Sequence, residues 1–184
     1  MTIITRLALA ATVALSPLTA FSQDAETTEE APVEAATDVV NGSAFGDWIV
    51  DCQALTAKRT ACRLIQEQSL RETGELVARF VAVPVEDGAI LLAQVPMGVY
   101  LPGGAVYRFT ENEEVEQRDM IWQRCAADIC EAAAPLDDDE LAIFAEHDSL
   151  LFGFRPTADG EPVILNVDIS SFAEAIAALR ANNS

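Results

Sequence analysis

The chain has 184 residues, of which 51% are hydrophobic, so it is long enough to form one domain with a substantial core. Eleven basic and 30 acidic residues give a formal net charge of −19, and such a surface repels phosphate backbones and anionic headgroups. We therefore expect no nucleic acid as a partner. No segment approaches the roughly 18 consecutive apolar residues of a transmembrane helix, so no transmembrane span is expected.

Residues 1–22 have the pattern of a secretory signal peptide. Arg6 is the only charged residue of a short amino-terminal region, and Leu7–Leu15 forms an apolar stretch too short to cross a bilayer. Small residues follow at Ala20 and Ser22, in the positions that signal peptidase requires. The pattern predicts cleavage after Ser22 and a mature protein in the periplasm or secreted.

Residues 23–44 are predicted to be an acidic disordered linker. This stretch holds six acidic residues and no basic residue, with Ala, Thr and Pro between them. It cannot bury enough apolar surface to offset the entropy lost on ordering. We interpret it as a solvated tail, or as a spacer that holds the domain away from a surface.

The predicted domain, residues 45–180, begins with a hairpin. Trp48, Val50 and Cys52 alternate with polar or exposed positions, which indicates a half-buried strand. After a polar stretch, Cys62 and Leu64 resume the inward face on the second arm. A cysteine on each arm could therefore fix the register of the two strands.

Two apolar strands and a bent segment follow the hairpin. Leu76–Val83 and Ala89–Val95 are apolar on nearly all positions, as in central strands. Val95–Gly104 contains two prolines and three glycines, which exclude a helix and limit strand pairing. The apolar side chains of this segment cannot all be used in sheet packing, so Met97 and Tyr100 are the candidate contact surface. The competing interpretation is a structural kink that buries its own side chains.

The second half of the domain is predicted to add strands and two short helices. Asp137 and Glu140 have the spacing of a capping box, as do Ser171 and Glu174 before the last helix. In all, about eight short strands with two short helices predict a mainly β fold, a sandwich or a barrel-like variant. The further elements are an extended stretch at Val115–Arg124, a reversal at Cys125–Cys130, a hairpin of Leu150–Arg155 and Pro162–Ile169, and a helix face formed by Phe172, Ile176 and Leu179.

The four cysteines are predicted to form disulfides, because an even number in an exported chain is typical of an oxidising compartment. Three connectivities are possible, and the short spacings favour Cys52–Cys62 and Cys125–Cys130. Metal binding would require C-x-x-C pairs or several histidines, whereas the chain has one histidine. We therefore predict no metal site.

Catalytic motifs are not recognisable in the sequence. Nothing matches G-x-S-x-G, G-x-G-x-x-G or the P-loop, so no catalytic residue and no cofactor are predicted. His147 is interpreted as a helix-terminal residue, favourable beside the last carbonyl groups. Trp48 and Trp122 lie in strand patterns and are interpreted as core or half-buried residues rather than recognition aromatics.

An ordered set of motifs resembles the invasion-associated locus B family of secreted Gram-negative proteins. The set covers roughly Ala44 to Leu179, and its motifs are F-G-D-W-x-x-x-C at Phe45–Cys52 with the partner Cys62, P-x-G-x-x-L-P-x-G at Pro96–Gly104, C-x4-C at Cys125–Cys130, and a terminal S-F-x-x-A-x-x-A-L. The resemblance implies an immunoglobulin-like β-sandwich, two local disulfides and, in the pathogens that name the family, a part in entering host cells. It supplies no catalytic residues.

The leading hypothesis is a non-enzymatic binding protein of the periplasm or cell surface, whose partner is a protein or envelope component. One alternative is an extracytoplasmic hydrolase with a site not visible in sequence, and another is a purely structural envelope component. Binding predicts an exposed apolar patch near Met97 and Tyr100. A hydrolase predicts a concave pocket with convergent polar groups. The sequence indicates neither the oligomeric state nor a specific ligand.

Overall fold

The computed structural model describes residues 39–110 and 117–182. The expected signal peptide and residues 23–38 of the expected linker lie outside the described residues. Val39 is buried, and its carbonyl accepts a hydrogen bond from the Asn182 side chain at 3.1 Å. The packed part of the chain therefore includes Val39, six residues before the expected boundary at residue 45.

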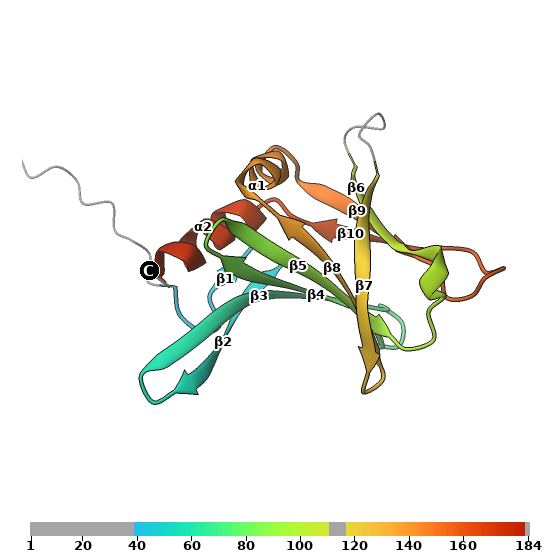
Figure 1. The fold of residues 1–184 in the computed structure, drawn as a ribbon, viewed down its shortest axis with the longest axis horizontal. Helices are drawn as coiled ribbons and strands as arrows, with labels where there is room; N and C mark the ends of the chain where they lie inside the picture. Colours follow the sequence, from blue (N-terminus) through green and yellow to red (C-terminus); the bar gives the residue numbers. More distant parts are fainter. Residues whose placement is uncertain (1–38, 111–116, 183–184) are drawn as a thin grey trace, which may run out of the picture. The chain divides into compact units, whose positions relative to one another are not determined.

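The described residues form ten strands, one short 3-10 turn and two helices (Figure 1). The strands are β1 (Ala44–Phe45), β2 (Trp48–Thr56), β3 (Arg59–Ser69), β4 (Leu76–Val85), β5 (Gly88–Pro96), β6 (Ala105–Phe109), β7 (Arg118–Ala126), β8 (Ile129–Leu136), β9 (Ser149–Phe154) and β10 (Val163–Asp168). The 3-10 turn is Leu101–Gly103, and the helices are α1 (Asp138–Ala145) and α2 (Phe172–Asn182).

All ten strands belong to one curled antiparallel sheet with the order β1-β2-β3-β4-β5-β8-β7-β6-β9-β10. The strand β7 joins its two halves, because Ile121–Ala126 pairs with β8 whereas Arg118–Met120 pairs with β6. A mainly β fold with two helices is confirmed. The described residues have ten strands rather than about eight. The two separate sheets of an immunoglobulin-like sandwich are not confirmed, because hydrogen bonding continues through β7, and the curled sheet is closer to the barrel-like variant.

The predicted first hairpin is β2 and β3, and its outer part extends away from the core (Figure 1). Cys52 and Cys62 are directly opposite each other across the pair and form a disulfide. Cys125 and Cys130 are likewise opposite each other on β7 and β8 and form the second disulfide. Each bridge therefore lies within one hairpin, the two pairs favoured by sequence spacing.

An aromatic cluster joins the two halves of the sheet to the helices. The rings of Phe80 on β4 and Phe152 on β9 meet edge to face, with centroids 5.2 Å apart. Phe144 of α1 packs at 5.1 Å from Phe172 of α2, which in turn packs at 4.9 Å from Trp48 of β2. All five side chains are almost completely buried, so the core lies between the inner faces of the sheet and the two helices.

Both helices begin close to where the sequence places them. Asp137 caps α1 by accepting a hydrogen bond from the Glu140 amide at 2.8 Å. The other half of the expected capping box is absent among the described residues, because the Glu140 carboxylate binds Tyr107 and Arg118 instead. On α2, the expected apolar face is buried. Neither helix of the described part of the chain is both long and apolar enough to span a membrane.

Candidate functional site

An apolar groove lies where the core opens at one end of the sheet, and we call it the mouth groove. It has a volume of about 360 Å³ and is formed by the turn between β3 and β4, the chain that follows β5, and the ends of β9 and β10. The described residues of its lining are apolar except for Glu75, and they are Leu70, Glu75, Leu76, Val77, Pro96, Met97, Gly98, Val99, Phe154, Pro156 and Val163.

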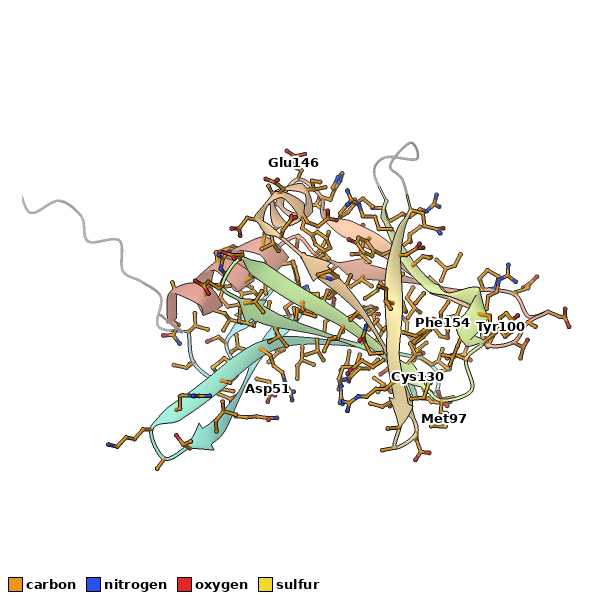
Figure 2. The ribbon with its side chains drawn as sticks, in the orientation of Figure 1. Asp51, Met97, Tyr100, Cys130, Glu146 and Phe154 are labelled. Carbon is orange, nitrogen blue, oxygen red and sulfur yellow. A yellow bond between two sulfur atoms is a disulfide. The ribbon has the colours of Figure 1, made fainter. Side chains whose placement is uncertain are left out.

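Met97 lies on the rim of the mouth groove because the sequence ends β5 immediately before it. Pro96 is the last residue of β5, and the Met97 amide then donates a hydrogen bond to the carbonyl of Asp128 in the β7–β8 turn, at 2.8 Å. The side chain of Met97 is 52% exposed. Figure 2 shows Met97 at the end of the domain opposite Glu146, which follows α1. A flexible thioether side chain at this position can adapt to an apolar partner.

Tyr100 lies apart from the mouth groove lining. Its amide donates a hydrogen bond to the Arg155 carbonyl at 2.8 Å, and its ring lies against Gly103. The side chain is 37% exposed, and Figure 2 shows it near Phe154 rather than beside Met97. The structure thus brings Met97 together with groove residues, whereas Tyr100 belongs to the neighbouring turn.

The edge strand β10 begins at the mouth groove, where Val163 forms part of the lining. The Ile169 amide donates to the Asp148 carbonyl next to β9. Because antiparallel pairing alternates along a strand, the main-chain groups of Leu165 also face β9, and those of Ile164 and Asn166 face outward. Within the described residues, β10 has no strand on that outer side.

The far end of the β10 edge is closed by a tryptophan. Trp48 donates its indole N–H to the carbonyl of Asp168, the last residue of β10, at 2.9 Å. This bond links the strand next to one edge of the sheet to the strand at the other edge. The accessible part of the β10 edge is therefore the part that leads into the mouth groove.

A polar network between β6, β7 and α1 connects these elements and does not include any described residue of the mouth groove lining. The Tyr107 hydroxyl donates to Glu140 at 2.8 Å, and Arg118 forms an ion pair with the same carboxylate at 2.6 Å. Burial, with added effects from the hydrogen bond to Glu140 and its charge, raises the pKa of Tyr107 above its ordinary value. The network connects β6, β7 and α1, and thereby holds the junction of the sheet to the helix.

The histidine and the two tryptophans that were considered from the sequence pack against other side chains of the domain. His147 stacks on Phe109, with ring centroids 4.4 Å apart. Trp48 is fully buried and Trp122 is half-buried, as expected from their strand patterns. Among residues 39–110 and 117–182, no three His, Cys, Asp or Glu side chains are grouped so that they could hold a metal ion.

Sequence reasoning did not identify the partners of Met97 in the mouth groove. Leu70 follows β3, whereas Phe154 ends β9 and Val163 begins β10, so the lining combines the β3–β4 turn with the β9–β10 hairpin, far away in the chain. The sequence signal was a leucine at position 70 next to the polar turn residues Arg71–Thr73, and in the structure this side chain is 49% exposed. Their convergence depends on the curl of the sheet, which no local pattern encodes.

Comparison with known proteins identifies a family and a solved structure of the same fold. The profile described as "Invasion associated locus B (IalB) protein" matches residues 48–180. The crystal structure of invasion associated protein B from Bartonella henselae has the same fold, with a TM-score of 0.63 and 17% sequence identity, over 76% of this chain and 94% of that chain. No curated protein sequence matches this chain. Because the family profile covers well over half of the sequence, the chain belongs to the invasion associated locus B family.

Proposed function

We propose that this protein is an exported, non-enzymatic binding protein whose mouth groove takes an apolar side chain from an extended segment of a partner protein. The observation that carries the proposal is the junction of two features at Val163. An apolar groove with an exposed methionine on its rim adjoins a strand edge with outward main-chain groups.

The two features together favour a polypeptide partner. Strand addition to an open sheet edge supplies main-chain hydrogen bonds, and a pocket for alternate side chains supplies specificity. Ile164 and Asn166 offer the outward N–H and C=O groups, and the mouth groove lies at the start of the same strand. Glu75 is the only charged residue among the described lining residues, so the segment that enters should be uncharged.

Export is supported by the two disulfides and by the amino-terminal sequence. Disulfides persist in oxidising compartments such as the periplasm and the cell surface. Residues 1–22 have the signal-peptide pattern described above. The family name associates related proteins with invasion, and we extend to this chain a role in contact with a host cell or another surface.

Site-specific photo-cross-linking tests the proposal in intact cells. A photoreactive phenylalanine analogue at position 97 should give a defined adduct with one protein, because its side chain would lie beside the bound segment. The same analogue at Leu55, which is exposed on the β2–β3 hairpin away from the groove, is the matched control. Mass spectrometry of the adduct should identify an apolar, extended segment of the partner.

Two variants separate binding from folding. Met97→Asp should remove the adduct formed from a photoreactive residue at position 164, with no change in the melting temperature, because position 97 is exposed. Asn166→Pro should also remove an adduct at position 97, since proline deletes an outward-facing amide and is tolerated on an edge. Equal adducts from positions 97 and 55, or capture unaffected by both variants, would contradict the proposal.

A further inference from the structure

A second groove lies on the outer face of β6, β9 and β10, and we call it the outer groove; among the described lining residues it shares only Phe154 with the mouth groove. It has a volume of about 430 Å³. Pairing across the three strands places Val106, Gly153 and Ile164 in one row, and Arg108, Leu151 and Asn166 in the next row. Strands in a sheet are about 4.8 Å apart, so each row is about 10 Å long.

Gly153 leaves the floor of the outer groove open at its centre. A Cβ atom added there would have Val106 Cγ2 as its nearest neighbour, at 3.6 Å, which is an ordinary contact. The backbone therefore does not require glycine at this position, and a larger side chain would occupy the hollow rather than disrupt the strand. On either side, Val106, Leu151 and Ile164 provide apolar surface, and Ile164 is 60% exposed.

The charged side chains among the described lining residues of the outer groove are both arginines, although the protein is strongly acidic. Arg108 and Arg155 line it, and no Asp or Glu is among its described lining residues, although the chain has 30 acidic residues. Among the described residues, five other arginines form ion pairs with carboxylates, namely Arg63, Arg79, Arg118, Arg124 and Arg180.

The two groove arginines differ in what they bind within the domain. Arg155 donates to the carbonyl of Gly160 at 2.9 Å, so one of its donors is occupied. Arg108 has no ion pair or side-chain hydrogen bond with any described residue. Its guanidinium is thus the groove donor that no described side chain occupies, and Arg108 lies in the row next to Val106, Gly153 and Ile164.

We propose that the outer groove binds an amphipathic organic anion of the fatty-acid type, with its carboxylate on Arg108 and its alkyl chain across Val106, Gly153 and Ile164. Guanidinium groups bind carboxylates with paired, charge-assisted hydrogen bonds. An inorganic anion would use the arginine and leave the apolar row exposed, whereas an alkyl chain about 10 Å long covers that row. Charge and shape thus favour the same ligand class.

The test uses the exported form of the chain, labelled with ¹⁵N, and sodium octanoate as the probe. Amide shifts in β6, β9 and β10 should saturate with added octanoate. Each buried methylene strengthens binding by up to about fourfold, so butanoate should bind at least about tenfold more weakly. The uncharged 1-octanol should bind at least about fivefold more weakly, because it cannot pair with Arg108.

Variants identify the site and separate binding from folding. Arg108→Gln should weaken octanoate binding at least about fivefold, and Arg108→Lys should restore part of it, whereas Arg59→Gln on the exposed β2–β3 hairpin should leave binding unchanged. Gly153→Leu should abolish binding by filling the hollow, with Gly153→Ala as the folding control. Equal binding of 1-octanol, equal effects of Arg108→Gln and Arg59→Gln, or shifts centred on Met97 would overturn the proposal.

Discussion

Replacement of Trp48 by phenylalanine tests how the curled sheet is held together. Trp48 is 1% exposed, packs on Phe172, and donates its indole N–H to the Asp168 carbonyl at the end of β10. Phenylalanine would retain a ring contact with Phe172 but would lose the hydrogen bond between β2 and β10. The change therefore tests one hydrogen bond between β2 and β10, two strands near opposite ends of the sheet.

The cost of Trp48→Phe can be worked out from two contributions. Loss of the hydrogen bond costs about 1 kcal/mol. The smaller ring leaves a cavity in a closely packed site, which costs roughly another 1–2 kcal/mol. We expect the free energy of unfolding to fall by about 2–3 kcal/mol, measured by urea denaturation followed by far-ultraviolet circular dichroism.

Trp122→Phe is the matched control for this prediction. Trp122 is half-buried, and its indole nitrogen has no hydrogen-bond partner among the described residues. Removing an unsatisfied buried N–H group offsets the cost of the smaller ring. Trp48→Phe should therefore cost at least about 1 kcal/mol more than Trp122→Phe. Equal costs, or a cost below about 1 kcal/mol for Trp48→Phe, would refute the role assigned to this contact.

Four further predictions follow from individual contacts and motifs. Because the fold raises the pKa of Tyr107, its neutral form stabilises the folded state fully below about pH 10, and this stabilisation is lost as the pH rises further. The free energy of unfolding of the wild type should therefore fall more steeply above about pH 10 than that of Tyr107→Phe. Parallel profiles would contradict this. Gly88→Ala should cost at least about 3 kcal/mol, because φ is +136° and a Cβ would clash with the backbone of β8; a cost below about 1 kcal/mol would be inconsistent with that turn. Replacing Cys125 and Cys130 together by serine should cost about 2 kcal/mol in urea denaturation, and no loss would show that the bridge does not stabilise the hairpin. The intact mass of the exported protein should correspond to a chain beginning at Gln23, and a mass that includes residues 1–22 would disprove cleavage.

Local patterns in the sequence predicted the elements whose signals are local. Alternation from Trp48 to Cys52 predicted the first strand, and the cysteine spacing agreed with the register of the hairpin. Asp137 was identified as a helix cap because Asp followed three residues later by Glu is a specific signal. The buried face of α2 followed from the spacing of Phe172, Ile176 and Leu179.

The remaining features depend on contacts between distant segments. The pattern of β7 is that of an ordinary strand, and nothing in it indicates that its first residues pair with β6 and the others with β8. Glu140 has the spacing of a capping box, but Tyr107 and Arg118 from other strands bind its carboxylate. In the same way, the sequence predicted Met97 as a candidate contact residue, whereas the groove beside it depends on the curl of the complete sheet.

Amide hydrogen exchange along β10 tests most directly whether an open edge beside the mouth groove receives a partner strand. In the free domain, the amides of Leu165 and Val167 should be protected by β9, and those of Ile164 and Asn166 should exchange rapidly. In the complex captured through position 97, Ile164 and Asn166 should become protected as well. Protection of Ile164 and Asn166 already in the free domain, or no change in the complex, would contradict the account.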